Sequence, residues 1–265
     1  MNKHLSKFFG ILFLLLELII VPEAVELMLS QNLSELPSIR IVALAMTFGS
    51  IALCILMSYS AISEQDDYPL QTFLFELMVF LCCIAPMTEL ITEALDTAGR
   101  PALNMLVNTI YYLIGINIAY VIMLYEFRII GAKRNPALPK VRRAASFLML
   151  LDNIATLLNI RFGYFFTISE TGMYESAPTF WLAFIVPMLI IALTVLTAYR
   201  EMKPGRQQRT FLCYWIFAIL ASFLQIRNDA LSVQYTGYTL SIIVIYINVQ
   251  SELDTSCMNL TEREV

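Results

Sequence analysis

Acidic and amide side chains stand inside stretches of the sequence that are otherwise apolar. Glu89 and Glu93 are four residues apart, so on a helix both side chains project from one face. Like charges at this spacing repel, which indicates a basic partner, one protonated carboxyl group or wet surroundings. Asn104 and Asn108 have the same spacing on the next apolar stretch. Residues of these types could bind a polar ligand.

Two further groups of polar residues extend this chemistry. Asp152 and Asn153 are adjacent within a later apolar stretch, which makes them candidates for a buried polar relay. The other candidates are amides and charged residues near the ends of apolar stretches: Asn159, Arg161, Gln225, Arg227 and Asp229. Acids and arginines that face each other could form a recognition pocket.

Metal, haem and thiol chemistry lack the residues that they need. The single histidine, His4, lies near the N-terminus, so histidine-ligated metals and histidine general bases lose their usual residue. The adjacent Cys82 and Cys83 point about 100° apart on a helix and cannot form a CxxC-type chelate or redox pair. No phosphate-binding glycine loop, nucleophile elbow or kinase signature is present. We therefore expect no metal site, no cofactor and no enzymatic activity.

The elements that must position these residues are long apolar segments. Of the 265 residues, 58% are hydrophobic and 14% are charged, against roughly 45–50% and 25% in ordinary globular proteins. Eight segments approach the roughly 20 residues needed to cross a bilayer, at residues 8–29, 39–62, 70–95, 102–127, 144–167, 178–199, 210–226 and 230–249. The pattern predicts an all-α, polytopic transmembrane helical bundle of seven to eight helices. It excludes a soluble enzyme, a nucleic-acid-binding domain and a disulfide-stapled secreted scaffold.

The first apolar segment differs from the others. Residues 1–7 are basic and precede an apolar core, as in a signal peptide, but several acids follow without a small-residue cleavage pattern. We expect residues 1–30 to form an additional span or an interfacial helix, with a cleaved signal or a re-entrant segment as alternatives. Residues 39–250 would form the main bundle, and residues 251–265 a cytoplasmic tail or the start of an output domain.

Charge in the connections predicts the orientation of the bundle. Residues 128–143 contain six Lys or Arg residues and residues 200–209 contain four, whereas residues 169–177 contain Glu170, Glu175 and no base. By the positive-inside rule the two basic connections are cytoplasmic and the acidic one is external. Counting spans from these loops places the C-terminus in the cytoplasm, and with eight spans the N-terminus as well.

On this topology the polar candidates divide by depth. Those of the outer half, which we name the outer-half cluster, are Glu89, Glu93, Asn104, Asn108, Asn159, Arg161, Gln225, Arg227 and Asp229. Asp152 and Asn153 lie deeper, on the cytoplasmic side of the middle. The cluster is a candidate ligand-binding pocket open to the outside. The alternative is that the amides serve interhelical hydrogen bonding and close packing, and that the charges reach lipid headgroups.

Five stretches form a recognisable series. They are ELITEALD at residues 89–96, LVNTIYYL at 106–113, the run from Tyr120 to Arg128, LDNI at 151–154, and the run from Gly237 to Gln250 with LSIIVIYINVQ. In this order they resemble the seven-helix membrane sensor regions that precede GGDEF diguanylate cyclase, histidine-kinase or other output domains in bacterial signalling proteins. The resemblance implies that the second to eighth segments form the sensor bundle, that its last helix leads into an output domain, and that it lies in a bacterial cytoplasmic membrane.

The C-terminal residues depart from that family. Residues 251–265 are too few for a cyclase or a kinase, while LTEREV at residues 260–265 resembles the opening of a LuxR-type helix-turn-helix domain. One interpretation is that the sequence stops at a domain boundary. The other is a stand-alone bundle that acts through partners.

These observations favour a signal-input bundle, a sensor or receptor in which a stimulus at the outer-half cluster moves the last helix. The expected partners are the lipid bilayer, a small-molecule or lipid ligand, a cytoplasmic output domain or signalling protein, and a second copy of the chain. We expect no direct nucleic-acid binding by the bundle. A small secondary transporter is the alternative, with Glu89, Glu93, Asp152 and Asn153 spread across membrane depth. A less favoured alternative is an intramembrane lipid-modifying enzyme that uses an acid pair such as Glu89 and Asp152.

Overall fold

The computed structural model describes residues 3–29, 38–63, 69–129, 137–202, 206–227 and 233–261. This part of the chain forms eight α-helices: α1 (Lys3–Leu29), α2 (Ser38–Ser63), α3 (Pro69–Ala98), α4 (Pro101–Ile129), α5 (Ala137–Phe162), α6 (Ile185–Glu201), α7 (Arg206–Arg227) and α8 (Gln234–Thr261). A short 3-10 helix, η2 (Phe180–Phe184), leads into α6. The prediction of an all-α helical bundle is confirmed.

Several of these helices have the length and composition of membrane spans. Among the described residues, four stretches qualify: Pro69–Asp96, Pro101–Arg128, Leu138–Phe162 and Phe180–Glu201. Ala45–Tyr59 and Leu212–Arg227 are apolar but shorter. Large apolar side chains remain exposed on the outside of α5, α6 and α7, among them Phe147, Leu158, Leu196 and Phe223. Such an extensive apolar surface is typical of membrane contact. The number of spans, seven to eight, and the cytoplasmic C-terminus stay predictions.

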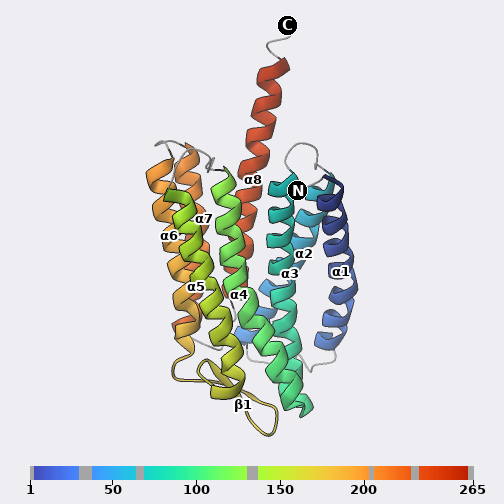
Figure 1. The fold of residues 1–265 in the computed structure, drawn as a ribbon. Coiled ribbons are helices and arrows are strands. Elements are labelled where there is room, and N and C mark those ends of the chain that lie inside the picture. Colours follow the sequence, from blue (N-terminus) through green and yellow to red (C-terminus); the bar gives the residue numbers. More distant parts are fainter. Residues whose placement is uncertain are drawn as a thin grey trace.

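The helices are arranged in two groups with a shared centre. Helices α1, α2 and α3 lie on one side and α5, α6 and α7 on the other, with α4 and α8 between them (Figure 1). Helix α4 packs on α3, α5 and α6, while α8 packs on α2, α3 and α7. Helix α1 begins and α8 ends at the same end of the bundle, which we call the exit end. The first and last described residues of the chain therefore lie at one end of the bundle.

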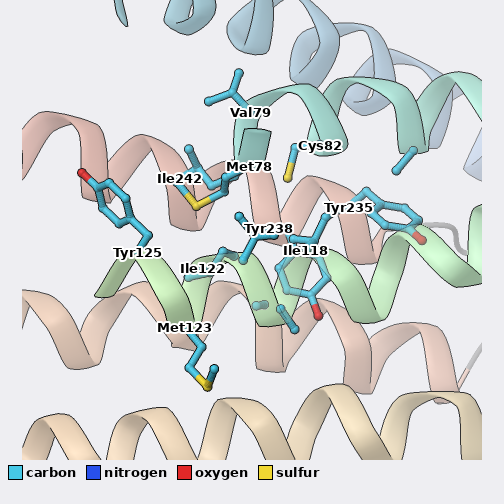
Figure 2. Close-up of a cluster of buried hydrophobic side chains, with 14 of the residues drawn as sticks. Met78, Val79, Cys82, Ile118, Ile122, Met123, Tyr125, Tyr235, Tyr238 and Ile242 are labelled. Carbon is cyan, nitrogen blue, oxygen red and sulfur yellow. The ribbon is translucent and has the colours of Figure 1, made fainter. Parts of the chain in front are cut away.

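The buried core follows the facing stripes of α3, α4 and α8. Figure 2 shows buried side chains from all three helices: Met78, Val79, Cys82, Ile118, Ile122, Met123, Tyr125, Tyr235, Tyr238 and Ile242. Pairs four residues apart, such as Met78 with Cys82 and Ile118 with Ile122, lie on one face of their helix. Because lipid tails are as apolar as these side chains, close packing and interhelical hydrogen bonds hold the helices together.

Helices α1 and α8 lie next to the two predicted domain boundaries, and residues 30–37 at the first of them are outside the described residues. Helix α1 packs on α3, where the Phe13 and Phe80 rings stack with centroids 4.6 Å apart and Ser6 Oγ donates to the Pro69 carbonyl oxygen at 2.9 Å. Helix α8 crosses residue 250 without a break. Helix α1 thus packs on the bundle, and α8 continues past residue 250 as far as Thr261.

A small hairpin caps the end of the bundle opposite the exit end, which we call the hairpin end (Figure 1). Strand β1 (Phe166–Ile168) pairs antiparallel with β2 (Tyr174–Ser176), with Phe166 opposite Ser176. The fifth segment was expected to continue to residue 167, but α5 ends at Phe162. Gly163 follows with φ of 65°, a left-handed conformation that ends helices and favours glycine. The expected external loop is thus an ordered hairpin.

Candidate functional site

The structure distributes the outer-half cluster over several places at the hairpin end. Arg161 and Arg227 are exposed, Glu93 is half-buried and Glu89 is buried. Asp229 lies outside the described residues. The amides, in contrast, are bound into the framework, and each has a separate set of partners.

Asn104 and Asn108 attach the hairpin to the turn between α3 and α4. Asn104 is fully buried, and its Nδ2 donates to Asp96 Oδ1 and to the Gly172 carbonyl oxygen, each at 2.7 Å. Asn108 Nδ2 donates to Asn104 Oδ1 at 2.8 Å. The Tyr174 backbone N–H donates to the same Asp96 oxygen at 3.0 Å. These side chains hold the hairpin against the turn between α3 and α4.

Asn159 connects the last turn of α5 to the first strand. Its Oδ1 accepts from the Phe165 backbone N–H at 2.6 Å, and its Nδ2 donates to the Phe166 carbonyl oxygen at 3.1 Å. All three residues are buried. Buried backbone polar groups must be hydrogen-bonded, so Asn159 satisfies groups that the end of α5 would leave without partners.

Gln225 belongs to a buried group that joins three helices, which we call the tyrosine junction: Tyr111 of α4, Gln225 of α7, and Gln234 and Tyr235 of α8. Gln225 Nε2 donates to the Tyr111 hydroxyl at 3.2 Å, and the Gln234 backbone N–H donates to Gln225 Oε1 at 3.0 Å. The Tyr235 hydroxyl donates to the Tyr111 carbonyl oxygen at 2.6 Å, and the two rings meet edge to face with centroids 4.9 Å apart. Glu89 lies within electrostatic range of Tyr235. The start of α8 is thereby bound to its neighbours.

Gly115 leaves space for the Tyr235 hydroxyl group in the tyrosine junction. A Cβ atom at this position would lie 3.2 Å from the Tyr235 hydroxyl oxygen. Tyr111 and Tyr235 are not among the candidate site residues predicted from the sequence, because tyrosines are frequent at membrane interfaces and in packed cores. Their hydrogen bonds depend on which helices become neighbours.

Asp152 and Asn153 have different surroundings, as neighbours about 100° apart on a helix must. Asn153 Oδ1 accepts from Asn117 Nδ2 of α4 at 3.1 Å. Asp152 is buried on the inward stripe of α5 that also carries Thr156. Helix α4 lies between α5 and α3, so the acid pair considered for an enzyme, Glu89 with Asp152, is on helices that do not adjoin (Figure 1).

Three further carboxyl groups are buried within helices: Glu17, Glu76 and Glu126. Glu17 Oε1 accepts from Ser58 Oγ at 3.2 Å, and Glu126 Oε2 accepts from Trp215 Nε1 at 3.2 Å. The second oxygens of Glu17 and Glu126 are buried without a hydrogen-bond partner in the described part of the chain. Neither is among the site residues predicted from the sequence, although an acid inside an apolar run is the signal that indicates such groups.

Glu76 sits at a close contact between α1 and α3. A Cβ atom at Gly10 would lie 2.3 Å from Glu76 Oε1, so a larger residue there would displace the carboxyl group. Among the described residues, no three His, Cys, Asp or Glu side chains are grouped so that they could hold a metal ion.

Comparisons with known proteins identify no relative of this chain. No family model, no curated protein and no solved structure matches it. The likeness to bacterial sensor regions therefore stays a prediction that depends on the sequence stretches alone.

Proposed function

We propose that the protein is a membrane-embedded signal-input bundle in which α8 carries a change from the hairpin end to a cytoplasmic domain or partner. The observation that carries this proposal is the course of α8. It is a single helix from Gln234 to Thr261 that begins in the tyrosine junction and extends beyond all other helices at the exit end (Figure 1).

The length of α8 supports this role. Its 28 residues rise 1.5 Å each and span roughly 42 Å, whereas the hydrocarbon core of a bilayer is ~30 Å thick. About two turns of helix therefore lie beyond the core. The sequence of this part, SELDTSCMNLT, is polar enough for water. A stiff helix transmits rotation or sliding along its axis, so a shift at Gln234 would reach the exit end.

Helix α8 contacts α7 and α2, two of its three neighbours, in different ways. A Cβ atom at Gly237 would lie 2.4 Å from Ala221 Cβ and 2.7 Å from the Phe217 carbonyl oxygen, so α7 and α8 touch at this point. Ser241 Oγ also donates to the Tyr214 carbonyl oxygen of α7. Contact of this kind, through small residues, is the closest that membrane helices make. Helices α7 and α8 would therefore move as one unit.

On the other face, α8 meets α2 through longer contacts. Ser50 Oγ lies 3.5 Å from Thr236 Oγ1, and Cys54 Sγ lies 4.0 Å from Thr239 Oγ1. Hydrogen bonds of this length contribute little. The α7–α8 pair could therefore slide along its contact with α2. The hydrogen bonds of the tyrosine junction would oppose this movement.

The test uses the full chain followed by a histidine-kinase output domain, with residues inserted after Gln250. Two inserted residues rotate the output domain by about 200°, whereas seven restore the original direction to within about 20°. We expect the two-residue insertion to change kinase activity at least fivefold and the seven-residue insertion to leave it near that of the parent. Equal activity in all three proteins would contradict a relay through α8.

A carrier is the second candidate, and the buried carboxyl groups of Glu17, Glu126 and Asp152 favour it. Acids inside membrane helices often mark ion or proton pathways. Liposomes that contain the protein and a pH-sensitive dye would show proton flux under a pH gradient, and Glu17→Gln or Asp152→Asn would abolish it. Sealed liposomes with the native protein would leave the signal-input proposal as the better one.

A further inference from the structure

A groove of about 300 Å³ opens at the exit end, where α3 begins, α4 ends and α5 begins. Its lining residues are Leu70, Leu74, Leu124, Phe127, Arg128, Leu138, Pro139 and Arg142. They belong to three helices and lie far from the tyrosine junction and the hairpin. The groove is therefore separate from the hydrogen-bonded groups at the hairpin end.

The groove has an apolar floor and a basic rim. Leu74, Phe127 and Leu138 are buried and form the floor, whereas Arg128 and Arg142 are exposed at the rim. Among the described residues, the lining includes no acidic side chain. Glu126 directly precedes the lining residue Phe127 in the chain, but its carboxyl group accepts a hydrogen bond from Trp215 Nε1 of α7. A ligand that fits must carry negative charge beside an apolar part.

The depth of the groove in a bilayer follows from the ends of the helices. Two candidate spans begin here, at Pro69 and Leu138, and a third ends at Arg128. The rim thus lies at the level of lipid headgroups, and Arg142, about one turn inside its span, can extend its charge toward the surface. The first-turn N–H groups of α5 add the positive end of a helix dipole at the same level.

We propose that this groove binds one anionic phospholipid. Its phosphate group lies between Arg128 and Arg142, and the upper part of one acyl chain covers the leucine and phenylalanine floor. Arginine forms strong, charge-assisted hydrogen bonds to phosphate oxygens. Basic pockets between membrane helices are the usual sites for acidic headgroups. A zwitterionic lipid would add its own positive charge to a rim that already carries two.

The test measures lipid binding to the purified full chain by native mass spectrometry, with phosphatidylglycerol and phosphatidylcholine as probes. We expect phosphatidylglycerol to bind at least tenfold more tightly. Arg128→Gln and Arg142→Gln should each weaken it about fivefold (~1 kcal/mol), and the double variant about 30-fold. Equal binding of the two lipids would overturn the proposal.

The matched control is Arg143→Gln, since Arg143 is exposed on the same helix but does not line the groove. It should change binding less than twofold, and a loss equal to that of Arg142→Gln would mean surface attraction without a site. Leu138→Trp fills the floor while both arginines remain, and it should weaken binding at least tenfold; unchanged binding would overturn the acyl-chain part and with it the proposal.

Two further arms distinguish other occupants. Inorganic phosphate at millimolar concentration should not displace the lipid, because it gains nothing from the floor; displacement would show a site for phosphate alone. If the double variant changes the oligomeric state in place of lipid binding, the groove is an interface between copies of the chain and the proposal fails.

Discussion

The two ends of the bundle use polar residues in opposite ways. At the hairpin end, Asn104, Asn159 and Gln225 are buried and hydrogen-bonded to backbone groups. These bonds hold turns and helix ends in place. At the exit end, Arg128 and Arg142 are exposed beside an apolar floor. The difference teaches that burial and partners, rather than residue type, separate a framework residue from one that can meet a ligand.

This contrast makes Asn159 the most sensitive of these positions. Asn159→Ala leaves the Phe165 N–H and the Phe166 carbonyl group buried without their partner, and each such group costs ~1–3 kcal/mol. We expect the free energy of unfolding to fall by roughly 3 kcal/mol, measured by equilibrium unfolding in mixed micelles. Arg161→Gln, two residues away and exposed, should change it by less than ~0.5 kcal/mol. Equal losses of unfolding free energy in the two variants would contradict the distinction between hydrogen-bonded and exposed residues at this end.

Asn104 should follow with a smaller loss. Asn104→Ala removes the bonds to Asp96, Gly172 and Asn108, but the site borders the exposed Gly99 and Arg100, so water can replace part of them. We expect a loss of ~2 kcal/mol and faster hydrogen exchange at Tyr174, whose N–H shares the Asp96 oxygen. Glu170→Gln at the exposed turn serves as the control. Unchanged exchange at Tyr174 would argue that the hairpin holds its position without Asn104.

Tyr235→Phe addresses the tyrosine junction. It removes one interhelical hydrogen bond, which in membranes contributes ~0.6 kcal/mol on average and up to about 1.7 kcal/mol. We therefore expect a small loss of stability together with a clear change of output in the kinase fusion. Tyr199→Phe, on an exposed side chain of α6, should alter neither. A stable variant with unchanged output would show that the junction is packing alone.

The exit end should show the smallest effect on stability. In lipid-free detergent, Arg128→Gln with Arg142→Gln should change the free energy of unfolding by less than ~0.5 kcal/mol, because both side chains are exposed. With phosphatidylglycerol added, only the native protein should gain thermal stability, since a ligand stabilises the folded state it binds. A large loss without lipid would mean that these arginines are framework residues too.

The helices themselves could be predicted from the sequence. Long apolar runs such as residues 102–127 and 178–199 have few alternatives in a chain with so little charge. Their ends were less certain, because Gly163 and the bonds of Asn159 end α5 before residue 167. The hairpin was not predicted, since its bonds to Asp96, Asn104 and Asn159 come from three helices and leave no local signature in its own sequence.

The candidate site could be predicted only in part. Spacing correctly put Asn104 with Asn108, because four residues make one helical turn. It could not show that Asn153 would bond to Asn117, or that Tyr111 would meet Gln225 and Tyr235 from two other helices. Such partners are separated by tens of residues in the chain, so only the packing of helices selects them.

By itself, then, the sequence determined an all-α bundle and the positions of its polar residues along each helix, because hydropathy and the helical period are local properties. The tertiary structure decided which of those residues face each other: that the outer amides bind backbone, that Gly237 brings α7 and α8 into contact, and that Arg128 and Arg142 share a groove. The reason is physical. A helix sets the direction of each side chain, but only the neighbouring helix determines whether that direction leads to a partner, to lipid or to an open groove.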